Sequence, residues 1–331
     1  MLMNSTLLNI RSEPVPDCPM CGAKDRSKTI KDVHDWFFEC IDGSWNIAVC
    51  ADCATLFLDP RPVEKDLPLA YTSYYTHAAL EKEPIGESLG VRSSRQWITN
   101  SILNARFGTR LEPCFPLSLP EIVARPFMND RIESRFRNFP KLFLGAKILD
   151  VGCGSGKFLK RIRRAGWRGF GVDFDKKAVN EAQIAGLNVI VGDISCSEVF
   201  SEKFDAISFN HVIEHVPDIP QTLKTAYRLL KSDAFLHLEY PNPQADGLAR
   251  YGRFWRGLEA PRHLCIPSRN AITTMLKEIG FHRVIFSTGN LDAANVDAAS
   301  KDAAKRNLAS YIEPEATKLV EPAFLKLIAW R

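Results

Sequence analysis

The chain has 331 residues, of which 45% are hydrophobic and 25% are charged, and its formal net charge is +4. This length predicts about two domains and a core large enough to fold without disulfides. The weak positive charge permits binding of an anionic ligand but does not favour nucleic acid. There is no run of about 18 apolar residues, so we expect no membrane-spanning helix.

The N-terminal ten residues lack the basic start and the cleavage site of a secretory signal, so we expect a cytoplasmic protein. Thiols stay reduced in the cytoplasm, and the nine cysteines therefore call for an interpretation other than disulfides. Four of them form two close pairs, at Cys18 and Cys21 and at Cys50 and Cys53.

Each pair has the CxxC spacing, in which one turn points two thiolates at one ion. Four thiolates form a closed tetrahedral site, so we predict a structural zinc ion. The separation of the pairs exceeds the usual fifteen to twenty or so residues, so we expect a hairpin between them, with residues 47–49 in one of its strands. A rubredoxin-like iron site and cysteines without metal are the alternatives.

Residues 60–62 read Pro-Arg-Pro, which interrupts regular structure and indicates a domain boundary. We therefore predict a zinc-ribbon-like domain over residues 1–60, a helical linker or lid over 61–140, and a catalytic domain over 141–331. Tyrosines cluster early in the linker, at Tyr71, Tyr74 and Tyr75.

From residue 147 onward, short apolar runs alternate with helical patterns. We predict strands over residues 147–151, 169–173, 188–191, 204–209, 235–240 and 282–288, with helices between them. Such alternation implies parallel pairing with right-handed crossovers, so the predicted fold class is α/β, a Rossmann-like doubly wound sheet. Ligands bind at the carboxyl ends of the strands in such sheets.

Three glycines follow the first predicted strand. Gly152, Gly154 and Gly156 come directly after Asp150 and before a predicted helix. Glycines allow a tight turn and the close approach of a ligand, and the helix N-terminus offers free amides to a polar ligand. The spacing is GxGxG, whereas the nicotinamide-binding fingerprint is GxGxxG.

Carboxylates follow the next two predicted strands. Asp173 ends the second strand, where a carboxylate accepts hydrogen bonds from both hydroxyls of a ribose. Asp193 follows the third strand, where it can accept from an adenine amino group. A helix cap for Asp173 and a turn residue for Asp193 are the alternatives.

The segments ILDVGCGSGKF, GVDFD, VGDI and FDAISFNHVIEHVPD resemble the successive motifs of class I S-adenosylmethionine-dependent methyltransferases, over about residues 130–290. The resemblance implies S-adenosylmethionine as the cofactor, with the three glycines around its methionine part, Asp173 on the ribose and Asp193 near the adenine. It places Phe174 beside the adenine, with a core position as the alternative. The remaining cofactor-binding candidates are Asp150, Cys153, Ile194 and Asn210.

Two histidines, His211 and His215, follow the fourth predicted strand. In similar methyltransferases this segment lines the cofactor and the acceptor pocket, so both are catalytic candidates, although His215 could instead pack against the next turn. The same residues read as HxxEH, a zinc-protease pattern that needs a long helix. Pro217 argues against such a helix.

Residues 250–268 are too long for a tight turn, and long loops are usually functional. Their APRHL sequence resembles that of methyltransferases of the ubiquinone pathway and of sugar modification. By that resemblance His263 is the strongest candidate for a general base or acceptor ligand. A solvated loop histidine is the alternative.

A zinc ribbon, a tyrosine-rich stretch and this domain, in that order, resemble sugar C-methyltransferases and also ribosomal RNA guanine methyltransferases. We predict methyl transfer to a small-molecule acceptor, a sugar or quinol-like ring, at oxygen or carbon. The alternatives are a ribosomal RNA base methyltransferase and a non-catalytic zinc-scaffold or cofactor-binding protein. After Asn290 the sequence reads as an alanine-rich helix, where folds of this family have a seventh strand, and only residues 327–330 could supply it. We therefore expect an altered or truncated C-terminus.

Overall fold

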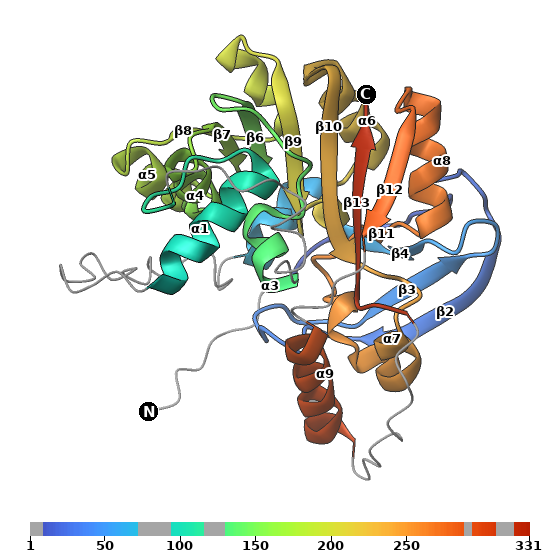
Figure 1. The fold of residues 1–331 in the computed structure, drawn as a ribbon. Coiled ribbons are helices and arrows are strands. Elements are labelled where there is room, and N and C mark those ends of the chain that lie inside the picture. The colour runs from blue at the N-terminus through green and yellow to red at the C-terminus, as the bar shows by residue number, and fades with distance from the viewer. Residues whose placement is uncertain (1–8, 72–93, 116–129, 288–292, 309–320) are drawn as a thin grey trace. The chain divides into compact units, whose positions relative to one another are not determined.

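The computed structural model describes residues 9–71, 94–115, 130–287, 293–308 and 321–331 (Figure 1). Tyr74 and Tyr75 lie outside the described residues. No helix in the described ranges is long and apolar enough to cross a membrane.

The chain divides into two compact units, each built from separate stretches of sequence. Unit 1 comprises residues 1–74, 210–224 and 238–327, and unit 2 comprises residues 75–209, 225–237 and 328–331. These units interleave along the chain, so they do not test the three consecutive segments expected from the sequence. That division of the chain stays a prediction.

The larger sheet has seven strands in the order β12-β13-β10-β9-β6-β7-β8. Their bounds are β6 Lys147–Val151, β7 Arg168–Asp173, β8 Asn188–Val191, β9 Phe204–Asn210, β10 Leu230–Pro241, β12 Arg283–Ser287 and β13 Phe324–Trp330. Strand β6 pairs in parallel with β7 and β9, and β7 pairs in parallel with β8. All six predicted strands are present, which confirms the Rossmann-like α/β fold.

Unit 2 holds helices that pack on its parallel strands. Helix α4 (Lys157–Arg164) contacts β7, and α5 (Lys176–Ile184) contacts β8 (Figure 1). Close packing of α4 depends on Gly171, where a Cβ would lie 2.8 Å from Leu159 Cδ1. Among its described residues, this unit also contains the helices α1 Ser94–Phe107, α3 Asp130–Glu133, η4 Ser134–Phe136 and η5 Ile194–Phe200. Helix α6 (Ile219–Leu229) follows β9.

The predicted alanine-rich helix is present as α9 (Ala293–Asn307), but the expectation of an altered C-terminus is wrong. Strand β13 lies between β12 and β10, so the seventh strand is in place. It begins at Phe324, earlier than predicted, and includes Lys326. The Lys326 ammonium lies 2.8 Å from the Glu239 carboxylate, and this buried pair lets a charged residue occupy a strand that otherwise reads as apolar.

In unit 1 the cysteine-bearing region forms an antiparallel sheet in the order β11-β4-β3-β2. The bounds are β2 Arg26–Val33, β3 Trp45–Cys50, β4 Leu56–Leu58 and β11 Cys265–Ile266. Strands β2 and β3 are the predicted hairpin between the cysteine pairs. Strand β11 is supplied by a distant part of the chain and pairs with β4. Strands β1 (Ser12–Glu13) and β5 (Arg61–Pro62) pair separately, and η1 (Glu64–Tyr71) follows.

The predicted loop over residues 250–268 is a folded, largely buried segment. It contains the end of α7 (Asp246–Tyr251), then η7 (Gly252–Phe254), η8 (Arg256–Leu258) and β11. Trp255 is 1% exposed, and a Cβ at Gly257 would lie 2.2 Å from its ring, so glycine allows the chain to wrap tightly around the indole. Ser268 is the N-cap of the following helix α8 (Arg269–Ile279), and its hydroxyl accepts from the Ala271 amide at 3.1 Å.

Candidate functional site

The glycine turn of unit 2 joins β6 to α4 through residues with positive φ. Gly152, Gly154 and Gly156 have φ of 72°, 51° and 80°, a region that favours glycine. A Cβ at Gly154 would meet no heavy atom within 4 Å, whereas one at Gly156 would lie 2.3 Å from Leu187 Cδ1. A side chain at Gly156 would therefore displace the end of Leu187, and Gly154 borders open space that a ligand can enter.

Asp173, at the end of β7, is hydrogen-bonded to this turn. Its Oδ2 accepts from the Gly154 amide at 2.7 Å, and its Oδ1 accepts from the Asp175 amide at 2.8 Å. Burial raises the pKa of the Asp173 carboxyl, although those two amides oppose the shift. The helix-cap alternative does not hold for Asp173, because Asp175 is the N-cap of α5. Asp173 is thus held beside the open face of the glycine turn.

Phe174, the next residue, is 75% exposed, so the core alternative for this side chain is wrong. An exposed aromatic ring beside a ribose-binding carboxylate has the chemistry to flank an adenine. Asp193 is exposed and caps η5, where its Oδ1 accepts from the Ser195 amide at 2.8 Å. Its predicted turn role is therefore present, and contact with adenine stays a prediction. Ile194 is buried at 3% exposure.

Asp150 is 1% exposed and forms a salt bridge with Arg137. The same guanidinium donates to Ser208 Oγ at 2.7 Å, and Ser208 Oγ lies 3.0 Å from His237 Nδ1. Burial raises the pKa of the Asp150 carboxyl, while Arg137 opposes this. Sequence analysis missed Arg137, which lies 13 residues upstream in a turn without a recognisable motif.

Cys153 and Asn210 are the two remaining cofactor candidates. Cys153 is buried, and burial raises the pKa of its thiol, so the thiol stays protonated. Asn210 is half-buried at the end of β9. Their contacts with a cofactor stay predictions.

In unit 1 the structure brings two of the predicted catalytic histidines together. The ring centroids of His215 and His263 are 4.7 Å apart. His215 Nδ1 lies 3.0 Å from the Arg262 carbonyl, and His263 Nδ1 lies 2.8 Å from the Gly257 carbonyl. Burial lowers the pKa of both histidines to about 4, so both rings are neutral near pH 7. His263 is only 7% exposed, which rules out the solvated-loop alternative.

His211 also belongs to this cluster, and its side chain is 36% exposed. Its Nδ1 lies 3.6 Å from Glu214 Oε1, and its Nε2 lies 3.9 Å from Glu239 Oε1. Glu214 and His215 are in the short helix η6 (Ile213–His215), so the long helix of an HxxEH protease is absent from this described segment. Sequence analysis did not assign a role to Glu214, whose position between two histidines was the available signal.

A buried ion pair connects the histidine segment to the cysteine-bearing region. Arg262 is 0% exposed and donates through both terminal nitrogens to Asp35, at 2.8 Å each. Burial raises the pKa of the Asp35 carboxyl, but Arg262 overcomes this and holds it below its usual range. The guanidinium also donates to the Ala70 carbonyl at 2.9 Å. Asp35 thereby holds Arg262 next to His263.

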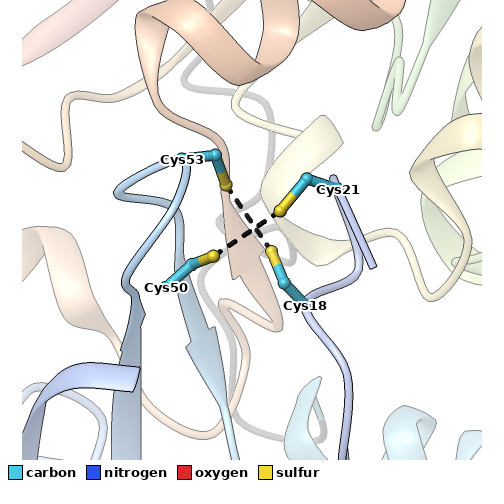
Figure 2. A group of neighbouring side chains, drawn as sticks. All are labelled: Cys18, Cys21, Cys50 and Cys53. Carbon is cyan, nitrogen blue, oxygen red and sulfur yellow. Dashed lines mark hydrogen bonds between the residues drawn. The ribbon is translucent and has the colours of Figure 1, made fainter. Parts of the chain in front are cut away.

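The four cysteine sulfur atoms converge on one point, as Figure 2 shows. The Sγ atoms of Cys18 and Cys53 are 3.6 Å apart, and those of Cys21 and Cys50 are 3.5 Å apart. Sulfur atoms about 2.3 Å from a tetrahedral zinc ion lie roughly 3.8 Å apart. None of the four is in a disulfide. The predicted cluster is confirmed, and its geometry fits a zinc-sized ion.

Comparison with known proteins adds to this geometry. Residues 125–284 match the family model described as a methyltransferase domain. Over these residues the chain is therefore similar to methyltransferase domains.

Relatives of this methyltransferase domain include the "Ubiquinone biosynthesis O-methyltransferase" of Pseudomonas entomophila (strain L48), 31% identical over 117 residues, or 33% of this chain and 50% of that protein. A protein of the same name from Xanthomonas oryzae pv. oryzae (strain PXO99A) is 32% identical over 129 residues, or 36% of this chain and 53% of that protein. The chain thus spans about half the length of the curated relatives it matches. A solved S-adenosylmethionine-dependent methyltransferase of Archaeoglobus fulgidus is 20% identical with a TM-score of 0.40, over 56% of this chain and 86% of that one.

Proposed function

We propose that this protein transfers the methyl group of S-adenosylmethionine to a hydroxyl oxygen of a small molecule. The observation that carries the proposal is the open glycine turn bonded to Asp173, with the exposed Phe174 beside it. The relatives' printed names, O-methyltransferases of ubiquinone biosynthesis, favour oxygen over carbon as the attacked atom and favour a quinol-like ring among the predicted acceptors.

The residues of the turn fit the cofactor through their chemistry. The Asp173 carboxylate keeps lone pairs for ribose hydroxyls after it has accepted two backbone amides. Phe174 offers its ring face to an adenine, and the space beside Gly154 admits the methionine part. When bound, the cofactor supplies an activated methyl group, so the protein contributes mainly orientation and the removal of a proton from the acceptor.

The histidines His211, His215 and His263 are our candidates for receiving that proton. The acceptor oxygen loses its proton to a neutral imidazole as the new oxygen–carbon bond forms and the sulfur–methyl bond breaks. The pKa values of His215 and His263 are lowered by burial, which keeps both rings neutral, and the His211 side chain is 36% exposed. We further propose that the four cysteines hold a structural zinc ion, which orders the sheet that supplies Asp35.

Replacement of Asp173 tests the cofactor site. We expect Asp173→Ala to weaken binding of S-adenosylhomocysteine about 10- to 100-fold in isothermal titration calorimetry, because hydrogen bonds to a charged group contribute about 1.5–3 kcal/mol. Asp175→Asn, which keeps an N-cap side chain on α5, serves as the control. Unchanged affinity in a folded Asp173→Ala protein would refute the assigned ribose contact.

A pair of glycine substitutions separates ligand contact from backbone strain. Gly154 and Gly145 both have positive φ, and neither has an atom within 4 Å of an added Cβ. Alanine at either position costs roughly 1–2 kcal/mol in strain, but only the methyl group at Gly154 enters the proposed cofactor space. We expect Gly154→Ala to weaken cofactor binding about tenfold or more, while Gly145→Ala binds like the native protein. Equal effects of the two substitutions would contradict the site.

A further inference from the structure

The two halves of the cysteine cluster share one backbone pattern. The Cys18 amide donates to the Ala23 carbonyl at 2.8 Å, and the Cys50 amide donates to the Thr55 carbonyl at 3.0 Å. Ala23 and Thr55 therefore occupy equivalent positions, each directly after the turn that carries its cysteine pair. The second half thus has a hydroxyl at a position where the first half has only a methyl group.

The Thr55 hydroxyl lies next to the sulfur of Cys53. Thr55 is 0% exposed, and its Oγ1 is 3.2 Å from Cys53 Sγ. The same oxygen accepts from the Ser268 amide at 3.3 Å. A hydroxyl has one proton and two lone pairs, so its proton stays available for the sulfur. A thiolate that binds a metal ion has no proton of its own, and with an ion in the cluster Thr55 therefore donates to Cys53.

Ser268, the N-cap of α8, holds Cys53 by a second route. Its hydroxyl donates to the Cys53 carbonyl and accepts from the Ala271 amide at 3.1 Å. Ser268 is 3% exposed, so little solvent competes for these bonds. The residue that satisfies a free amide in the first turn of α8 therefore also fixes the backbone of Cys53 and, through Thr55, its sulfur.

The residue between Cys53 and Thr55 has an unfavourable backbone conformation. Ala54 has φ of 58°, whereas the equivalent residue of the first half is Gly22, with φ of 75°. Left-handed backbone is unfavourable for alanine and persists only where neighbouring contacts hold it in place. The bonds from Ser268 reach the residues on both sides of Ala54, so the contact with α8 maintains this conformation.

We propose that Thr55 is a positioning residue of the cysteine cluster, and that Thr55 and Ser268 couple the ion in this cluster to the first turn of α8. The inference rests on the proposed zinc ion and concerns the groups that surround its ligands. Hydrogen bonds from such groups orient a ligand and change how strongly it binds the metal. The coupling is reciprocal, because an ion that fixes Cys53 also fixes Ser268, and an ordered α8 presents Ser268 to Cys53.

Cobalt substitution of the full-length protein under reducing conditions tests the role of Thr55. Co²⁺ bound by thiolates produces charge-transfer absorption, and the energy of this band reports the electron density on sulfur. We expect Thr55→Val, which removes the hydroxyl at nearly constant volume, to move the band to lower energy and to weaken zinc binding about 10- to 100-fold. Thr55→Ser, which keeps the hydroxyl, should have the native band and affinity.

Thr29→Val, at an exposed threonine of β2, is the matched control and should leave the band and the zinc affinity unchanged. A native band position and native affinity in Thr55→Val would overturn the inference. An equal band shift in Thr55→Ser would also overturn it, because packing and not the hydroxyl would then be responsible. If the native protein binds Co²⁺ without thiolate charge transfer, the proposed zinc site fails together with the inference, so the two failures are distinguishable.

Hydrogen exchange of the full-length protein tests the coupling to α8. The amides of Ala271 and Ile272 donate to the side chain and the carbonyl of Ser268, so their protection reports the first turn. In zinc-loaded protein we expect Thr55→Val to lower this protection about tenfold, and in metal-free protein we expect the same substitution to change it less than twofold. Equal protection in zinc-loaded native and Thr55→Val proteins, or an equal loss with and without zinc, would overturn the coupling.

Discussion

Replacement of Asp35 by alanine is expected to lower the free energy of unfolding by about 3–5 kcal/mol, because it leaves the Arg262 guanidinium buried without its counter-charge. Both side chains are almost completely buried, and the pair has two hydrogen bonds of 2.8 Å. Asp35 also accepts from the Cys40 amide at 3.0 Å, so its loss frees a further buried donor. Denaturant-induced unfolding, followed by circular dichroism, measures this change.

An exposed ion pair provides the matched control. Asp302 and Arg306 are one helical turn apart in α9, and their side chains are 66% and 47% exposed. We expect Asp302→Ala to cost less than about 1 kcal/mol, because solvent screens such pairs. The double variant Asp35→Leu/Arg262→Met should recover most of the loss, since it removes both buried charges. A loss below about 1 kcal/mol in Asp35→Ala would show that water or another group compensates Arg262.

Loss of the ion from the cysteine cluster is expected to open the sheet formed by β2, β3, β4 and β11. Structural zinc contributes about 10–16 kcal/mol to folding in isolated zinc fingers. In this protein it would join Cys18 and Cys21 to Cys50, at the end of β3, and to Cys53 in the following turn. In Cys21→Ser we expect one equivalent less zinc. We also expect hydrogen-exchange protection of the β3 amides to fall by about 1,000-fold, equivalent to about 4 kcal/mol.

Another exposed cysteine controls for the chemistry of the substitution. Cys196, in unit 2, lies outside the cluster, so Cys196→Ser should keep the full zinc content and native protection of β3. If Cys21→Ser retains native zinc content, the four cysteines do not form the site. If it loses zinc but keeps native protection, the ion does not support the sheet, and its structural role is wrong.

The predictions for Asp35 and for the cysteine cluster both concern the contact between the cysteine-bearing sheet and the segment around His263 in unit 1. Strand β11 is at the edge of the four-stranded sheet and follows His263 after Leu264, whose carbonyl accepts from the Leu58 amide of β4 at 3.0 Å. Asp35, which lies between β2 and β3, accepts a hydrogen bond from Arg262. The cysteine-bearing sheet is therefore a scaffold for the segment that carries His263.

Local patterns in the sequence determined much of the fold and part of the candidate site. The glycine turn, Asp173 and the two CxxC pairs are recognisable because each depends on residues close in sequence with defined backbone requirements. The alternation of strands and helices likewise follows from periodicity, and all six predicted strands are present. Such features need no knowledge of distant contacts.

Only the tertiary structure decided the features that depend on residues far apart in the chain. Arg262 and Asp35 are 227 positions apart, and nothing near either residue indicates the other. Strand β13 was obscured by Lys326, whose partner is Glu239 on β10. The structure also showed which cofactor candidates are exposed. The Phe174 side chain is exposed, whereas Asp150 is buried and pairs with Arg137. The physical reason is that periodicity and turn chemistry are local, whereas charge pairing and burial are set by which segments the folded chain brings together.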